Sequence, residues 1–181
     1  MNLLKCKISN STTRCNDCIK KSTTCKHPQI LIDPNVFIAK YLLEKDTYNL
    51  ASKFIEKHRR KHRIVITHLG YGEILNRIFK NKDEFDTFYE VRSAILKDLY
   101  SFECIETPFG KPDFDCILDA LLETQFRSIG NRDKVHIATA VYHKVTFCSF
   151  DEKIHDDIEL INSTIDPITT NKTFKWHHIK K

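Results

Sequence analysis

The sequence predicts an α/β fold in three layers, with a central parallel sheet covered by helices on both faces. Short apolar runs without polar alternation recur along the chain, as in strands that are buried on both faces. Amphipathic stretches of helical length separate these runs, and strands that alternate with helices form parallel sheets. Since crossover connections are almost always right-handed, the carboxyl ends of the strands should lie along one edge of the sheet.

Each expected element has a local reason in the sequence. Pro34 suits the first turn of a helix, where its missing N–H costs little, and Lys144 ends a helix before a continuous apolar run. The expected strands span residues 29–33, 64–67, 102–107 and 145–150, with further strands at 158–162 and, at the edge, 173–180. The expected helices span residues 34–45, 47–61, 71–79, 83–100, 114–126 and 133–144.

Length and composition restrict the class of protein. A chain of 181 residues fits one ordinary domain with an extension, and 41% hydrophobic with 29% charged residues is typical of a soluble globular protein. The first residues lack a signal-peptide core and no apolar run is long enough to span a bilayer, so we expect a cytoplasmic protein without a membrane partner. The formal net charge of +5 is a modest bias towards an anionic partner.

Residues 1–27 differ from the rest of the chain and are expected to form an extension ahead of a main domain at 28–181. They hold few apolar side chains and four of the seven Cys residues. In a cytosolic chain, an odd number of Cys with this crowding indicates reduced thiols or a metal site rather than a disulfide framework.

Four acidic residues stand at the places where a parallel sheet gathers its ligands. Asp33 and Asp151 follow apolar strands, Asp133 opens a helix, and Glu73 lies on the helix after the strand at 64–67. Ligands of open α/β sheets bind outside the carboxyl ends of the strands, so these carboxylates should converge. Each Asp is also a plausible helix cap, and Glu73 alone could be a solvated helix residue.

Gathered carboxylates repel one another unless a cation compensates their charge. An all-oxygen set without His or Cys suits Mg²⁺ or Mn²⁺. Such an ion activates a bound water and stabilises the transition state at a phosphodiester, with a second ion on the leaving oxygen where two are bound.

The chain resembles the PIN domain nucleases, the family that includes the VapC toxins of toxin–antitoxin pairs. The resemblance covers about residues 29–162. It rests on four motifs, which are LIDPNVF with Asp33 and Asn35, ITHLGYGEIL with Glu73, RDKVHIATAV with Asp133, and FCSFDEKI with Ser149 and Asp151. The third and fourth motifs together are the specific part.

The resemblance implies a five-stranded parallel sheet in the order 3-2-1-4-5 and a Mg²⁺- or Mn²⁺-dependent endoribonuclease activity. By the same resemblance, the metal would be held by Asp33, Glu73, Asp133 and Asp151, while Asn35 and Ser149 would orient water or the carboxylates. The expected role is that of a toxin or of an enzyme in RNA maturation or decay. RNA, an antitoxin protein and a second copy of the chain are the partners to expect.

Other residues have less specific interpretations. The basic run at 57–63 is either a solvated helix end or an RNA-backbone contact made by Lys57, Arg59, Arg60, Lys61 and Arg63. His136 is expected to be a packed or hydrogen-bonded core residue. Cys104, Cys116 and Cys148 lie in apolar segments, where a thiol usually acts as a small hydrophobe. A non-catalytic RNA- or protein-binding module on the same fold is the competing function, and it would not need all four acids.

The extension contains Cys15, Cys18, Cys25 and His27, spaced so that they could form a tetrahedral Zn²⁺ site, with Cys6 as the alternative fourth ligand. The alternatives are a disordered Cys-bearing tail and a redox-sensitive thiol cluster. A segment this polar has almost no core of its own, so a metal would supply the free energy that orders it.

If this zinc site exists, protein purified without added metal carries about one zinc ion per chain. Changing Cys15 and Cys18 to Ser should release the ion and make residues 6–27 sensitive to protease, while the acidic site is unaffected. Elemental analysis of reduced protein measures the zinc, and a zinc-free wild-type protein would exclude the site.

Overall fold

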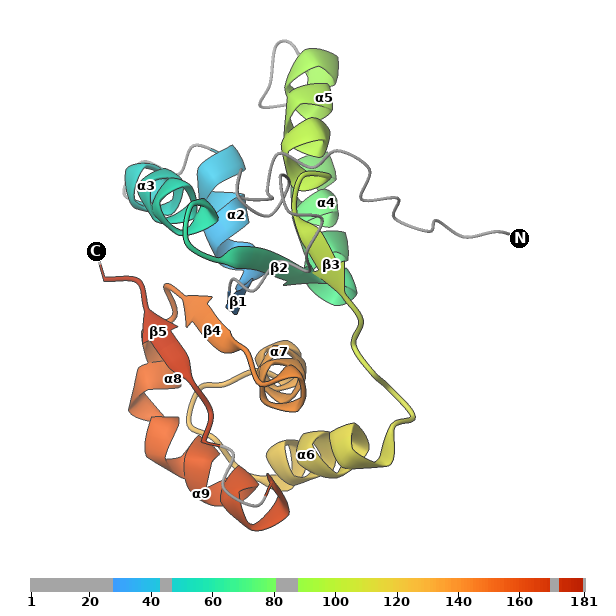
Figure 1. Cartoon of the computed structure of the whole chain (residues 1–181), viewed down its shortest axis with the longest axis vertical. Helices are drawn as coiled ribbons and strands as arrows, with labels where there is room; N and C mark the ends of the chain where they lie inside the picture. The colour runs from blue at the N-terminus through green and yellow to red at the C-terminus, as the bar shows by residue number, and fades with distance from the viewer. Residues whose placement is uncertain (1–27, 43–46, 81–87, 170–172, 181) are drawn as a thin grey trace, which may run out of the picture.

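The structure, a computed structural model, describes residues 28–42, 47–80, 88–169 and 173–180. Within these ranges the chain forms one five-stranded sheet with the strand order β3-β2-β1-β4-β5, and every neighbouring pair is parallel (Figure 1). This confirms the predicted three-layer α/β fold and its strand order.

The strands are short and follow the apolar runs of the sequence. Their bounds are β1 Gln29–Ile32, β2 Arg63–Thr67, β3 Glu103–Ile105, β4 Thr146–Ser149 and β5 Trp176–His178. Neighbouring strands are in a regular register, with Leu31 beside Val65 on one side and beside Phe147 on the other.

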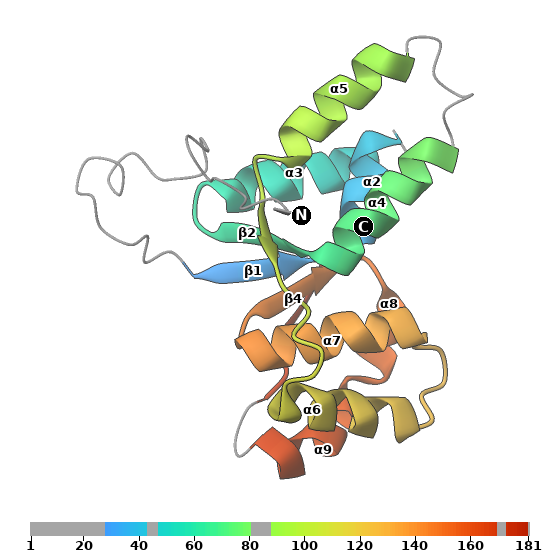
Figure 2. The same cartoon turned by 90° about the vertical axis from the view of Figure 1, so that its right-hand side faces the viewer.

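Helices cover both faces of the sheet, as Figure 2 shows from the side. On one face lie α2 Pro34–Tyr41, α3 Tyr48–Arg59, α4 His68–Lys80 and α5 Phe88–Leu99, and on the other α6 Pro112–Glu123, α7 Asn131–His143 and α9 Ile158–Thr169. The short helix α8, Glu152–Asp156, follows β4.

The core is therefore divided in two by the sheet. Alternate residues of a strand point to opposite faces, so Ile30 and Ile32 of β1 enter the cluster under α2 to α5, while Leu31 enters the cluster under α6, α7 and α9. Both clusters are well buried, and Ile32 and Leu31 are at most 1% exposed. This explains why the strand at 29–33 is apolar without alternation.

One predicted strand is wrong. Residues 158–162 belong to α9, because Ile161 and Ile165 are buried at helical spacing, while Leu160 is exposed. The tail at 173–180 does supply the edge strand, as β5. Along the described ranges, none of the helices is both long enough and apolar enough to cross a membrane.

The proposed extension at 1–27, with its candidate zinc ligands, lies outside the described residues. The domain boundary at residue 28 and the zinc site therefore stay predictions.

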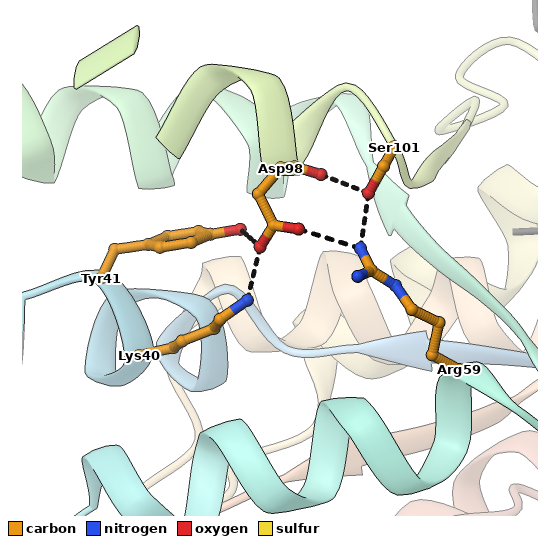
Figure 3. A network of polar contacts seen from close by, with 5 residues as sticks. All are labelled: Lys40, Tyr41, Arg59, Asp98 and Ser101. Atoms are coloured by element: carbon orange, nitrogen blue, oxygen red, sulfur yellow. Dashed lines mark hydrogen bonds and ion pairs between the residues drawn. The ribbon is translucent and has the colours of Figure 1, made fainter. Parts of the chain in front are cut away.

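A polar network around Asp98 holds three helices of one layer together (Figure 3). The carboxylate of Asp98 on α5 accepts hydrogen bonds from Lys40 and from Tyr41 Oη at 2.9 Å, both on α2, and from Arg59 Nη2 at 2.9 Å on α3. Arg59 also donates to Ser101 Oγ, which in turn donates to the Asp98 carbonyl. The Arg59 guanidinium also lies over the Phe102 ring, where its charge is attracted to the face of the ring.

The network requires an ionised Asp98. Burial by itself would raise the pKa of this carboxyl, but the hydrogen bond and charge of Lys40, with the hydrogen bonds of Arg59 and Tyr41, hold the pKa below its ordinary value of 3.8.

Replacing Asp98 by Asn should lower the free energy of unfolding by about 2 kcal/mol at neutral pH, because two cations and a hydroxyl lose an ionised partner that is only partly exposed. Since the folded-state pKa is depressed, the contribution is complete above about pH 4 and disappears as the pH falls through the folded value. Urea unfolding at several pH values measures this, with Asp119→Asn on the exposed side of α6 as the control. An equal loss in both variants would contradict the proposed role of the network.

Candidate functional site

The carboxyl ends of the parallel strands place two of the predicted acids directly. Asp33 follows β1 and caps α2, where its Oδ1 accepts the Asn35 N–H at 2.8 Å. Asp151 follows β4 and caps α8, where its Oδ1 accepts the Lys153 N–H at 2.9 Å. Both are therefore helix caps as well as acids at the carboxyl ends of the strands. We call this end of the sheet, with Asp33, Glu73, Asp133 and Asp151, the acidic edge.

Ser149 connects these two acids. Its Oγ donates to Asp33 Oδ2 at 2.7 Å and accepts the Asp151 N–H at 3.0 Å, and the residue is completely buried. The ladder between β1 and β4 continues past the last residue of β1, because the Asp33 N–H donates to the Cys148 carbonyl at 2.9 Å. Asn35, by contrast, is exposed, and it contacts Asp33 through its backbone.

Asp133 lies at the third residue of α7 rather than at its cap, which corrects the expectation that it opens the helix. Its Oδ2 accepts the Gly130 N–H at 3.1 Å and so closes the turn that precedes the helix. The helix ends at the other edge of the sheet with Lys144 in the left-handed conformation, φ 57°. The start of α7 is thereby placed at the acidic edge.

Glu73 lies in the second turn of α4 and faces a buried histidine that the sequence interpretation assigned to the core. His136 Nε2 is 3.7 Å from Glu73 Oε1, and neither atom has a hydrogen-bond partner in the described part of the chain. The other ring nitrogen, Nδ1, is 3.2 Å from Thr67 Oγ1, and the ring stacks on Phe147. His136 is thus a packed, hydrogen-bonded residue as expected, but it also faces the acidic edge.

Close packing at Gly70 fixes the direction of α4. A Cβ there would lie 2.8 Å from Pro34 Cγ and 3.0 Å from Thr67 Oγ1, and the Gly70 N–H donates to that same Oγ1 at 2.8 Å. Only glycine allows α4 to start this close to the first turn of α2. Glu73, on the next turn of α4, is positioned by this contact.

Asp133 interacts electrostatically with the other three acids. Burial raises the pKa of Asp33 above 3.8 against the hydrogen bonds of Ser149 and the Asn35 N–H, and the charge of Asp133 raises it further. Burial also raises the pKa of Asp133 against its bond to Gly130, and the charges of Asp151 and Glu73 add to this. The charge of Asp133 therefore interacts with the charge of each of the other three carboxylates.

Comparison with known proteins identifies the family of the chain. A sequence profile described as PIN domain matches residues 30–158, which is more than half of the chain. The chain belongs to the PIN domain family. No curated protein matches it significantly.

Among solved structures, the PIN domain is similar to a chain in the crystal structure of VapBC2 from Rickettsia felis bound to a DNA fragment from their promoter. The alignment covers 83% of this chain and 98% of that chain, with a TM-score of 0.55 and 14% sequence identity. At this identity the likeness shows a shared fold.

The acidic edge of this PIN domain fits a hard divalent cation in its chemistry. All four acids supply oxygen donors, Glu73 Oε1 is buried without a hydrogen-bond partner among the described residues, and the repulsion at Asp133 is what a cation would relieve. As the side chains stand in the described ranges, no three carboxylate, imidazole or thiol groups are close enough together to hold one ion.

The basic residues of the predicted RNA contact are not brought to this edge. Arg63 starts β2, and its N–H donates to the Pro28 carbonyl, so the run lies at the amino ends of the strands. Arg59 binds Asp98 and Arg63 binds Glu103, whereas Lys57, Arg60 and Lys61 are exposed. The structure thus separates the run into residues that stabilise the fold and residues that face solvent.

The cysteines in apolar segments do not form a nucleophilic site. Cys148 is buried within β4, and burial raises the pKa of its thiol to about 12. Cys116 is exposed on α6, which differs from the expectation that it is a core hydrophobe.

The raised pKa of Asp33 gives a prediction for metal-free protein. Because burial disfavours the charged carboxylate, its ionisation costs folding free energy at every pH above the raised pKa, and the cost disappears below about pH 4. Asp33→Asn removes this charge, but it also leaves one of the two donors, the Ser149 hydroxyl or the Asn35 N–H, without an acceptor oxygen. The stability of the variant relative to wild type should therefore rise as the pH increases from about 4 to 7. Urea unfolding in a chelator measures this, with Asp166→Asn on α9 as the exposed control. A stability difference between the variant and wild type that does not change with pH would contradict the assignment of Asp33 as a buried charge with a raised pKa.

Proposed function

We propose that this PIN domain is a Mg²⁺- or Mn²⁺-dependent endoribonuclease that hydrolyses RNA phosphodiester bonds. The observation that supports this best is that Ser149 Oγ joins Asp33, through a 2.7 Å bond, to the Asp151 N–H, at 3.0 Å, at the carboxyl ends of β1 and β4. The charge of Asp133 adds to the raised pKa of Asp33. Like charges on four different elements are costly to gather without a cation, so their convergence favours a metal site over four independent caps. Dependence on divalent metal is also general in PIN domains.

In this proposal Asp33, Glu73, Asp133 and Asp151 hold the cation. The bound ion would activate water and stabilise the charge that develops on the phosphodiester. Ser149 is a positioning residue, because its Oγ fixes Asp33 through a 2.7 Å bond and the chain at Asp151 through a 3.0 Å bond. Asn35, exposed beside Asp33, is placed to orient water at the mouth of the site.

His136 and Thr67, which lie within the third and second motifs, extend the proposed site beyond the acids, Asn35 and Ser149. Thr67 Oγ1 contacts both the Gly70 N–H and His136 Nδ1, so one hydroxyl ties the start of α4 to α7. The imidazole then faces Glu73 from a fixed direction. We propose that this contact keeps the Glu73 carboxylate turned towards Asp133.

Fewer residues of the basic run remain candidates for contacts with RNA. The exposed residues Lys57, Arg60 and Lys61 remain candidates for phosphate contacts. Arg59 and Arg63 are only partly exposed, and they would have to give up their ion pairs with Asp98 and Glu103 to reach RNA. Because this run lies at the amino edge of the sheet, it would bind the backbone well away from the cleaved bond.

The cellular role we propose is that of a toxin or of an enzyme in RNA maturation or decay, in the cytoplasm. By analogy with the VapBC2 structure, which shares the fold, an antitoxin protein and a second copy of the chain are proposed as partners. A non-catalytic binding module is the alternative function, and it would not need all four acids.

Purified protein should cleave RNA in Mg²⁺ or Mn²⁺ and stop when the ion is chelated. Asp151→Asn keeps the shape and the capping oxygen of the side chain while removing a ligand charge, so its cleavage rate should fall by at least about a hundredfold with the fold retained. Gel assays with a labelled RNA measure the rate, and thermal unfolding checks the fold.

The matched control is Asp156→Asn, an exposed acid on the same short helix, which should keep the wild-type rate. Mn²⁺ should also raise the melting temperature of wild-type protein and of Asp156→Asn, but not that of Asp151→Asn. Equal cleavage by wild type and Asp151→Asn would show that the acids are not the active site.

A further inference from the structure

Three near-parallel aromatic rings lie together where β5 meets α8. The rings of Trp176 and His178 have centroids 5.2 Å apart and planes at 13°. His155 on α8 is 5.5 Å from Trp176 at 26° and 6.3 Å from His178 at 19°. We call these three residues the ring cluster.

The ring cluster is continuous with the acidic edge. His178 is the register partner of Ser149, and the N–H of Ile179, directly after β5, donates to the Ser149 carbonyl at 2.9 Å. Neighbouring strands are about 4.8 Å apart, so the backbone of His178 is one strand spacing from the residue that holds Asp33. His155 is in the first turn after Asp151, since α8 begins at Glu152.

The cluster also lies on the same face of the sheet as Ser149, which binds Asp33. Side chains alternate along a strand, so Trp176 and His178 share the face of their partners Phe147 and Ser149. His177 points to the opposite face, where its ring contacts those of Phe54 and His58. The sheet therefore separates the ring cluster from its nearest neighbour in the sequence.

The exposure of the cluster suits an outside ligand. His155 is exposed, Trp176 and His178 are half-buried, and β5 is an outer strand of the described sheet. Exposed lysines flank the rings at positions 153, 175 and 180, against exposed acids at 152 and 156.

We infer that the ring cluster stacks on a base of single-stranded RNA next to the phosphate at the acidic edge. Aromatic rings beside exposed cations are the usual means by which proteins hold unpaired nucleotides, because every base has a π face and every phosphate a charge. The position of the cluster, one strand from Ser149, would align the chain of the RNA with the carboxylates. This inference rests on the proposed function, since it takes RNA as the substrate.

Trp176 is the only tryptophan of the chain, so its fluorescence reports directly on this site. Full-length protein in a chelator, where cleavage cannot proceed, is titrated with a short single-stranded oligoadenylate. Saturable quenching of the Trp176 emission is expected. An abasic oligomer of the same length should cause little quenching and bind at least about tenfold more weakly, because it offers phosphates without bases.

Variants separate stacking from charge. His178→Ala and His155→Ala should each weaken binding of oligoadenylate by roughly tenfold, as measured by the anisotropy of a labelled oligomer. His178→Phe keeps a flat ring and should stay within about threefold of wild type, which guards against a folding artefact. His177→Ala, the matched control on the opposite face of the same strand, should bind within about twofold of wild type.

Unchanged Trp176 emission would overturn the inference and leave the rings to a protein partner or to packing within the chain. Equal quenching by the abasic oligomer, or an equal loss in His177→Ala, would overturn it as well. Because binding is read without metal, the two proposals can fail separately. Quenching by a protein that does not cleave RNA would leave the ring site standing, while cleavage without quenching would remove the ring site alone.

Discussion

The buried carboxylate of Asp33 is the constraint on which the site depends. It is only 4% exposed, and it is held by one hydrogen bond from Ser149 on β4 and one from the first turn of α2. These bonds lower the cost of burying the charge, but burial still raises the pKa of the carboxyl above its ordinary value. Buried carboxyls with a raised pKa cluster at functional sites, so we propose a functional role for Asp33 in addition to its role as the cap of α2.

The parallel sheet brings the other residues of the proposed site close to Asp33. Because all strand pairs are parallel, Thr67, Asp33, Ser149 and His178 come to neighbouring positions at one edge, each from a different strand. Helices α4 and α7 then bring Glu73 and Asp133 to the same edge, with Gly70 and the Thr67 hydroxyl setting how closely α4 approaches. The acids are thus assembled by topology and not by proximity in the sequence.

The sequence was sufficient for the features that depend on local pattern. The apolar runs of β1, β2 and β4 and the acids that follow them could be predicted, because buried strands and their ends have a direct signature. The prediction of a strand at 158–162 was wrong, because a short apolar run fits a strand or a buried helix equally well. The helix α9 continues seven residues beyond this run. The ion pairs of Arg59 and Arg63 could not be predicted, since their partners Asp98 and Glu103 are 39 and 40 residues away. The role of Thr67 and the direction of His136 likewise depend on packing between elements.

The central claim is that Asp33, Glu73, Asp133 and Asp151 form one divalent-metal site. The most direct measurement is anomalous diffraction from crystals of the protein grown with Mn²⁺, because it locates the ion independently of activity. We predict a strong anomalous peak at the carboxyl edge of the sheet, within about 2.5 Å of oxygens from at least two of the four acids. Well-ordered, saturated crystals with Mn²⁺ bound elsewhere and none at this edge would contradict the claim.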